Sequence, residues 1–206
     1  SAQAVIGHAL AQLKHPSSLF AAEKVWIGSG ARGPAQIDAS RALWGVSRFD
    51  LIQVHNLLAW EAHLATLQGM KAAGRLRYVG ITTSEGRRHD ELVRIMQTQP
   101  LDFIQVSYNV LDREVESRIL PLARERKIAV IVNRPFRQGA LTQALAHQPL
   151  PGWAAEIGCT SWAQVLLKFI ASHPDVTCAI PATAKPAHAL ENMLAARGPL
   201  PDSALR

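Results

Sequence analysis

The sequence has little cysteine and no long hydrophobic run, and each shortage excludes a class of protein. Cys159 and Cys178 are its two cysteines. Two are too few for a disulfide framework, and their spacing fits no zinc site. We therefore expect two buried free thiols and no metal centre. No apolar stretch reaches the roughly 18–20 residues that a membrane-spanning helix needs, so we expect no membrane partner.

The charged residues lack any long run of one sign. Lys and Arg number 22 and Asp and Glu 16, which gives a net charge of +6. The densest basic spots are only Arg87-Arg88 and residues 124–127. A nucleic-acid-binding surface usually gathers its positive charge in one stripe with aromatic residues between the charges. We expect a solvated basic surface that attracts small anions such as phosphates, and no nucleic-acid partner.

Apolar residues are plentiful and follow alternating strand and helix periodicity. They make up 48% of the 206 residues, enough for a sizeable core. The periodicity predicts helices at about 4–13, 34–43, 60–73, 84–97, 115–126, 162–172 and 186–196. It predicts strands at about 18–26, 50–55, 77–83, 101–108, 128–133 and 176–181. Gly74 is expected to end one helix in the left-handed conformation, and Thr160 to cap another.

Alternation of strands and helices along the whole chain predicts an α/β domain with a parallel sheet. Two architectures compete, an open doubly wound sheet and a closed (β/α)8 barrel. A barrel needs eight strand–helix units and typically about 250 residues, so this chain is about two strands short of one. We find no linker, low-complexity tract or second domain, so residues 1–206 are expected to form one domain.

In either architecture the active site lies at the carboxyl ends of the strands. Polar side chains occur at that point after every predicted strand. They are Lys24, His55, Thr82, Thr83, Gln105 to Asn109, Asn133, Arg134 and residues 181–185. A purely surface role would not concentrate polar groups at these positions, so together they indicate a pocket.

Gly28, Gly30 and Gly33 match the pattern G-x-G-x-x-G. After a strand and before a helix, this pattern is typical of a dinucleotide-binding turn. Three features weaken that interpretation. Glu23-Lys24 interrupts the preceding strand, Pro34 follows the third glycine, and a helix precedes the whole unit. A Rossmann-type dehydrogenase that uses these glycines is therefore the weaker alternative.

Five segments carry motifs in the order and spacing of one known family. They are residues 19–26 (LFAAEKVW), 50–55 (DLIQVH), 74–83 (GRLRYVGITT), 103–113 (FIQVSYNVLDR) and 180–192 (IPATAKPAHALEN). With these motifs the chain resembles the aldo-keto reductases over essentially its whole length, which is more specific than any single motif. The resemblance implies a (β/α)8 TIM barrel that is incomplete here, with family strands 3–8 and helix 2 onward present.

The same resemblance implies reduction of a small-molecule aldehyde or ketone with a nicotinamide cofactor, usually NADPH, with NADH as the alternative. In the family's catalytic set of Asp, Tyr, Lys and His, the Tyr protonates the carbonyl oxygen and the Lys lowers the Tyr pKa. Lys24 matches the family Lys and His55 the family His. The family Asp and Tyr precede the helix that residues 1–7 match, so the chain is expected to begin after them. Tyr78 and Tyr108 do not match the catalytic Tyr.

Carried over residue by residue, the resemblance also implies a set of cofactor contacts. The set is Thr82, Thr83, Gln105, Asn133, Arg134, Pro135, Phe136, Thr183, Lys185, His188, Glu191 and Asn192. Asn133 replaces the family's usual aromatic residue, which stacks on the nicotinamide. Lys185 and His188 stand where the family has Lys and Arg near the 2′-phosphate. Thr183 is expected to cap the last helix, whose N-terminus would receive adenosine phosphates.

Two questions stay open. The chain is either a carbonyl reductase or a catalytically incomplete relative that binds nucleotide or a partner without turnover. Its few cysteines fit a cytoplasmic protein, with the periplasm as the alternative, and the sequence predicts no oligomeric state. Of the eight histidines, those other than His55 and His188 are interpreted as ordinary surface or loop residues.

Overall fold

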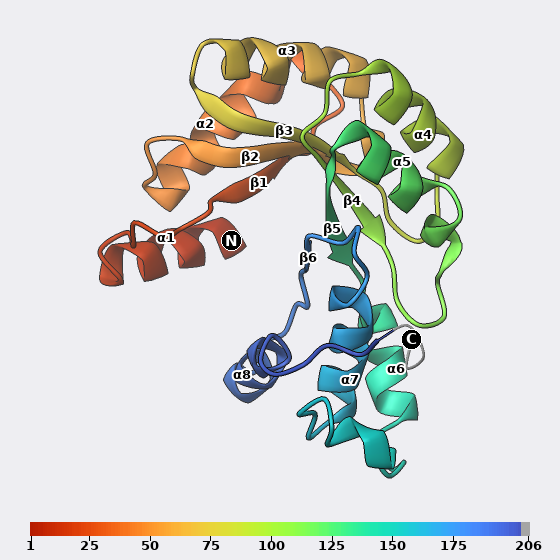
Figure 1. Cartoon of the computed structure of the whole chain (residues 1–206). Helices are drawn as coiled ribbons and strands as arrows, with labels where there is room; N and C mark the ends of the chain where they lie inside the picture. The colour runs from red at the N-terminus through yellow and green to blue at the C-terminus, as the bar shows by residue number, and fades with distance from the viewer. Residues whose placement is uncertain (203–206) are drawn as a thin grey trace. The chain divides into compact units, whose positions relative to one another are not determined.

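A computed structural model describes residues 1–202 and shows helices alternating with strands along the chain (Figure 1). The chain divides into two compact units. The first unit comprises Ser1–Thr82 and Gln99–Ile104, and the second comprises Thr83–Thr98 and the residues from Gln105 onward. Strand β4 (Phe103–Ser107) begins in the first unit and ends in the second.

In the first unit, helix α1 (Ala2–Gln12) precedes three parallel strands that alternate with helices. The elements are β1 (Ala22–Val25), α2 (Gly33–Trp44), β2 (Phe49–Val54), α3 (Trp60–Ala72) and β3 (Leu76–Thr82). Lys24 pairs in register with Gln53, and Gln53 with Gly80. Helix α3 packs against β2 and β3, which are buried along most of their length (Figure 1). Near-continuous apolar strands are typical of such a covered parallel sheet.

The second unit continues the alternation after β4. Its elements are α4 (His89–Thr98), α5 (Ile119–Arg126), β5 (Ala129–Asn133), α6 (Ala140–Ala144), α7 (Trp162–Ala171), β6 (Cys178–Ala179) and α8 (Pro186–Leu194). Strands β5 and β6 pair in parallel, α4 packs against α5, and α7 packs against α8. The core of this unit includes Tyr108, Val130, Val132 and Ile170, all fully buried.

The order of the strands decides between the two predicted architectures. Hydrogen-bonded neighbours run β1-β2-β3-β4-β5-β6, so the order follows the chain. A doubly wound dinucleotide-binding sheet has the order 3-2-1-4-5-6, with a reversal at its centre. Strands of a (β/α)8 barrel instead follow one another around the sheet. The chain therefore has the α/β organisation of the barrel type.

Several predicted elements are shorter than expected. The strand predicted at 18–26 is confined to β1, the last predicted strand is confined to β6, and the long interval predicted as a loop before α7 contains α6. The fourth helix begins only at His89, because Glu85, Gly86 and Arg88 adopt φ angles of 62°, 67° and 56°. This left-handed backbone cannot continue into a right-handed helix.

Three smaller expectations are corrected by the structure, and two are confirmed. Ser161 rather than Thr160 provides the side-chain cap of α7. Cys159 is buried as expected, but Cys178 is exposed. His63 was expected at the surface and is 1% exposed. Gly74, which follows the C-cap residue Ala73 of α3, has the predicted left-handed conformation with a φ of 71°.

Packing against α3 explains the glycine pattern at the start of α2. A Cβ on Gly30 would lie 2.5 Å from the Cβ of Ala62, and one on Gly33 would lie 2.8 Å from Nδ1 of His63. A Cβ on Gly28 would meet nothing within 4 Å. The second and third glycines are therefore required by the close approach of α3, without any dinucleotide in the turn.

We expect Gly33→Ala to lower the free energy of unfolding by about 1–3 kcal/mol, because the added methyl group overpacks the contact with the imidazole of His63. Gly28→Ala, which adds its methyl group in open space, should change it by less than about 0.5 kcal/mol. Urea unfolding of both variants measures the difference. A dinucleotide-binding turn would instead lose NADH affinity in both variants, so unchanged affinity argues against that alternative.

Candidate functional site

Lys24 and His55 lie close together at the carboxyl ends of β1 and β2 in the first unit. Burial lowers the pKa of Lys24 from its usual value, and the neighbouring carboxylate of Glu23 opposes this shift. Burial also lowers the pKa of His55, and the positive charge of Lys24 adds to the effect. The imidazole is therefore neutral at pH 7. A partly dehydrated lysine beside a neutral imidazole is a pair suited to stabilise negative charge on an oxygen atom.

Thr82, predicted as a cofactor contact, has its side chain engaged inside the first unit. The residue is 1% exposed, and its Oγ1 accepts the backbone N–H of Asn56 at 2.9 Å. Asn56 follows His55 directly and has a φ of 49°. The bond therefore holds the tight turn that carries the imidazole. Gln53, two residues before His55, is also buried, and its Nε2 has no hydrogen-bond partner within residues 1–202.

Neither tyrosine is placed as a proton donor beside Lys24. Tyr78 stacks on Phe20, with ring centroids 6.1 Å apart, and the guanidinium of Arg77 lies 4.8 Å from its ring centre. Tyr108 is fully buried in the second unit and donates its hydroxyl hydrogen to Glu116. Both side chains therefore make contacts away from Lys24, which agrees with their poor match to the family's catalytic tyrosine.

Thr83, Gln105 and Asn133 meet in a hydrogen-bond network of the second unit. The N–H of Thr83 donates to the carbonyl oxygen of Gln105 at 2.9 Å, and Nδ2 of Asn133 donates to the carbonyl oxygen of Thr83 at 3.1 Å. Ser107 donates its hydroxyl to Oδ1 of Asn133 at 2.6 Å and accepts the N–H of Glu85 at 3.0 Å. Oγ1 of Thr83 is buried without a partner in the described part of the chain. The network gives the carboxyl end of β5 a fixed polar surface.

A pocket of about 830 Å³ extends from the end of β5 to α8 within the second unit. We call it the larger pocket. Most of the predicted cofactor residues line it, namely Asn133, Arg134, Pro135, Phe136, Thr183, His188, Glu191 and Asn192. Lys185 and the buried residues Thr82, Thr83 and Gln105 are not part of its lining. Thr160, Ser161 and Trp162 at the start of α7 supply further lining.

The N-terminus of α8 borders the larger pocket. Lys185 is its N-cap residue, and Pro186 occupies the first turn. Thr183 accepts the N–H of Lys185 through Oγ1 at 3.1 Å, so this side chain orders the entry to the helix rather than capping its first turn. The first-turn N–H groups of a helix lack intrahelical acceptors and carry partial positive charge. This helix end therefore favours an anionic group.

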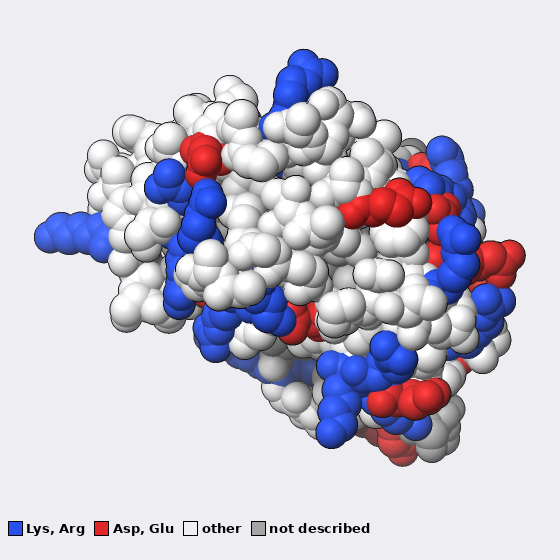
Figure 2. Space-filling model, turned by 90° about the horizontal axis from the view of Figure 1, so that it is seen from above, with Lys and Arg blue, Asp and Glu red and all other residues white. Residues whose placement is uncertain are grey.

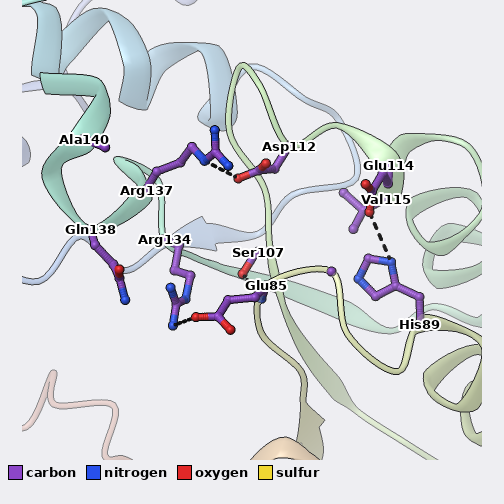
Figure 3. A pocket seen from close by; sticks show the side chains of 11 residues that line it. Glu85, His89, Ser107, Asp112, Glu114, Val115, Arg134, Arg137, Gln138 and Ala140 are labelled. Carbon is purple, nitrogen blue, oxygen red and sulfur yellow. Dashed lines mark hydrogen bonds and ion pairs between the residues drawn. The ribbon is translucent and has the colours of Figure 1, made fainter. Parts of the chain in front are cut away.

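A second pocket of about 390 Å³ in the same unit was not foreseen from the sequence (Figure 3). Arg134 reaches Glu85 at 2.6 Å across it, and Arg137 reaches Asp112 at 3.2 Å. Nδ1 of His89 lies 3.9 Å from Glu114, and its buried Nε2 has no partner in residues 1–202. Burial lowers the pKa of this imidazole, and the charges of Glu114 and Asp90 oppose the shift. Arg134 also lines the larger pocket. Its ion pair with Glu85 therefore already balances its positive charge at that pocket.

Figure 2 shows Lys and Arg side chains at many places on one face, with Asp and Glu side chains among them. In the described residues, no group of three or more His, Cys, Asp and Glu side chains is placed to hold a metal ion. No helix within residues 1–202 is both long and apolar enough to cross a membrane.

Comparison with known proteins gives one family. The family model described as "Aldo/keto reductase family" matches residues 1–206. An NADH-specific methylglyoxal reductase of Escherichia coli (strain K12) is 30% identical over 129 residues, which are 58% of this chain and 37% of that protein. The methylglyoxal reductase YeaE of the same organism is 27% identical over 194 residues, which are 93% of this chain and 68% of that protein.

Solved structures agree on the fold. The holo form of the aldo-keto reductase AKR11C1 from Bacillus halodurans matches with a TM-score of 0.79 at 20% identity, covering 99% of this chain and 74% of that one. An aldo/keto reductase from Klebsiella pneumoniae in complex with NADP and acetate matches with a TM-score of 0.77 at 22% identity, covering 94% of this chain and 69% of that one. At such identities the likeness establishes a shared fold.

Proposed function

Because the chain belongs to the aldo/keto reductase family, we propose that it takes part in the NAD(P)H-dependent reduction of small aldehydes and ketones. Lys24 and His55 would act on the carbonyl oxygen, and the larger pocket would hold the cofactor. The observation that carries this proposal is the larger pocket, whose lining gathers most of the residues predicted as cofactor contacts. Two relatives of this chain bear the name methylglyoxal reductase, which favours a small carbonyl substrate.

The residues of the second unit fit a dinucleotide. Ligand pockets usually measure about 300–1,000 Å³, and the larger pocket lies within that range at about 830 Å³. Its two ends differ as the two halves of a dinucleotide do. One end is the polar surface around Asn133, beside the hydroxyl of Thr83, which has no hydrogen-bond partner among residues 1–202. The other end is the N-terminus of α8, where phosphate oxygens would accept backbone N–H groups.

Within the first unit, Lys24 and His55 act on the substrate oxygen. A reduced nicotinamide would supply, when bound, the hydride for the carbonyl carbon, and negative charge would then develop on the carbonyl oxygen. The neutral imidazole of His55 donates a hydrogen bond and orients the carbonyl group, and the positive charge of Lys24 stabilises the alkoxide until it takes up a proton from water. Burial of both groups strengthens these interactions because less water screens them.

For the cofactor we propose NADPH, with NADH accepted less well. Arg134 is paired with Glu85, so the ammonium group of Lys185 and the imidazole of His188, near the start of α8, are the groups that we expect to contact a 2′-phosphate. Glu191 also lines the pocket and disfavours additional negative charge nearby. One relative is named NADH-specific and one structural neighbour was solved with NADP, so the two cofactors need direct comparison.

Fluorescence titration of the chain with NADPH and NADH tests this proposal. We expect both to bind, and Lys185→Met to raise the Kd of NADPH about fivefold to tenfold, because a hydrogen bond to a charged group is lost. The Kd of NADH should change less than about twofold, since it lacks the 2′-phosphate. Lys127→Met, at an exposed helix end, is the matched control. Absence of any dinucleotide binding would contradict the proposal, and binding without turnover in the natural full-length protein would favour the nucleotide-binding relative.

A further inference from the structure

Helix α8 carries residues of the larger pocket but has little apolar anchoring of its own. No residue between Pro186 and Leu194 is buried. Leu190 is 63% exposed and Met193 is 74% exposed. The hydrophobic burial that fixes most helices in place is therefore weak here. Some other interaction must hold His188, Glu191 and Asn192 in the lining of the pocket.

Helix α7 packs against α8 and contains a buried lysine, Lys168, that can provide such an interaction. Lys168 has no exposed surface. Its Nζ donates to the carbonyl oxygen of Arg197 at 2.5 Å and to that of Pro199 at 2.8 Å. Both acceptors belong to the segment that directly follows α8. A buried ammonium group is costly unless it is hydrogen-bonded, so the bonds and the placement of this segment depend on each other.

One helical turn earlier, Gln164 makes a second polar link on the same face of α7. The residue is 3% exposed. Its Oε1 accepts the N–H of Thr160 at 2.8 Å and the hydroxyl of Thr160 at 3.2 Å, while its Nε2 donates to the carbonyl oxygen of Glu191 at 3.4 Å. Thr160 and Glu191 both line the larger pocket, whereas Gln164 and Lys168 do not.

We propose that Gln164 and Lys168 are positioning residues that set the adenosine end of the cofactor pocket. This inference rests on the proposed function, because it assumes that the larger pocket holds a dinucleotide. Gln164 joins two walls of the pocket, and Lys168 ties the segment after α8 to α7. Together they hold the N-terminus of α8 where it can receive phosphate. Neither side chain touches the cofactor, so both act through α8.

The test uses the whole chain and the variant Lys168→Met, which keeps the length of the side chain and removes its donors. We expect the Kd values of ADP and NADPH to rise at least about tenfold, as the loss of a charged hydrogen bond allows. The Kd of reduced nicotinamide mononucleotide, which lacks the adenosine half, should change less than about twofold. Amide hydrogen exchange across α8 should accelerate by about tenfold with or without ligand.

Two controls separate positioning from general loss of stability. Val165→Ala truncates an apolar side chain of the same helix that does not line the larger pocket. This variant should lower the melting temperature without raising the Kd of ADP. Gln164→Leu provides a second probe in case Lys168→Met does not fold. It should raise the Kd of ADP about threefold. The inference would be overturned if Lys168→Met left amide hydrogen exchange in α8 unchanged. It would also be overturned if Val165→Ala raised the Kd of ADP as much as Lys168→Met does. If the unmodified chain binds no dinucleotide, the proposed function fails, and faster exchange in α8 then supports only the anchoring step.

Discussion

Lys24→Met in the natural full-length protein is expected to reduce kcat about 10³-fold while the Kd of NADPH changes less than about threefold. The side chain keeps its length, but the positive charge beside His55 is lost. That charge is partly buried, so it acts on the developing oxyanion with little screening by water. Lys24 belongs to the first unit, whereas the larger pocket, which we propose as the cofactor site, belongs to the second. Steady-state kinetics with methylglyoxal and a separate fluorescence titration of NADPH measure the two effects.

Lys127→Met is again the control, because it removes one positive charge from an exposed position at the end of α5. Its kcat should stay within about twofold of the unmodified enzyme. Circular dichroism should show that Lys24→Met remains folded at the assay temperature. Turnover of Lys24→Met at more than a tenth of the original rate would contradict the role of this lysine. Equal losses of turnover in both variants would point to a general effect of net charge.

Much of the fold was predictable because its strands have strong local signals. β2, β3 and β5 are short, mostly apolar segments followed at once by polar residues, and the helices between them have apolar faces at regular spacing. Their alternation requires parallel strands, since each crossover contains a helix. The strand order needed one more observation. Hydrophobic periodicity does not distinguish a sequential sheet from one that reverses, and only the pairing of strands decided the matter.

Features that depend on distant contacts could not be predicted from local pattern. The helix expected at residue 84 begins later because Glu85 and Gly86 take left-handed backbone conformations. The N–H of Glu85 bonds the hydroxyl of Ser107, a residue 22 positions away in the chain. His63 looks like an exposed helix residue in the sequence, yet its Nε2 lies 2.7 Å from the carbonyl oxygen of Ile27. Tertiary contacts override local preference at all these positions.

In the candidate site, too, local motifs predicted some features, whereas others depend on contacts with distant residues. Motif order identified the residues at the end of each strand, and the larger pocket gathers several of those at the ends of β5 and β6. The motifs could not reveal that Arg134 is already paired with Glu85, or that the hydroxyl of Thr82 is engaged by the turn after His55. Nor could they assign a role to Lys168, because a lysine in an apolar helix normally indicates an exposed position. Each of these depends on a partner at least 26 residues away in the sequence.

The structure explains Asn133, whose presence the sequence alone leaves unexplained. By resemblance it replaces an aromatic residue, which leaves its presence unexplained. In the structure its amide joins the end of β5 to Ser107 on β4 and to the backbone of Thr83. No aromatic side chain carries an amide group, which here accepts from Ser107 and donates to Thr83. The substitution therefore exchanges a stacking surface for a polar junction at the end of the larger pocket.

Asn133→Leu should consequently lower the free energy of unfolding by about 2–4 kcal/mol, because it leaves the hydroxyl of Ser107 and the carbonyl oxygen of Thr83 without their partner. Urea unfolding measures the loss. In the double variant with Ser107→Ala, the two losses should fall short of additivity by about 1 kcal/mol or more, since both substitutions break the same bond. Asn192→Leu, at a partly exposed position in α8, should cost less than about 0.5 kcal/mol. Additive losses for Asn133 and Ser107 would show that they act independently, and the polar junction would then not account for the asparagine.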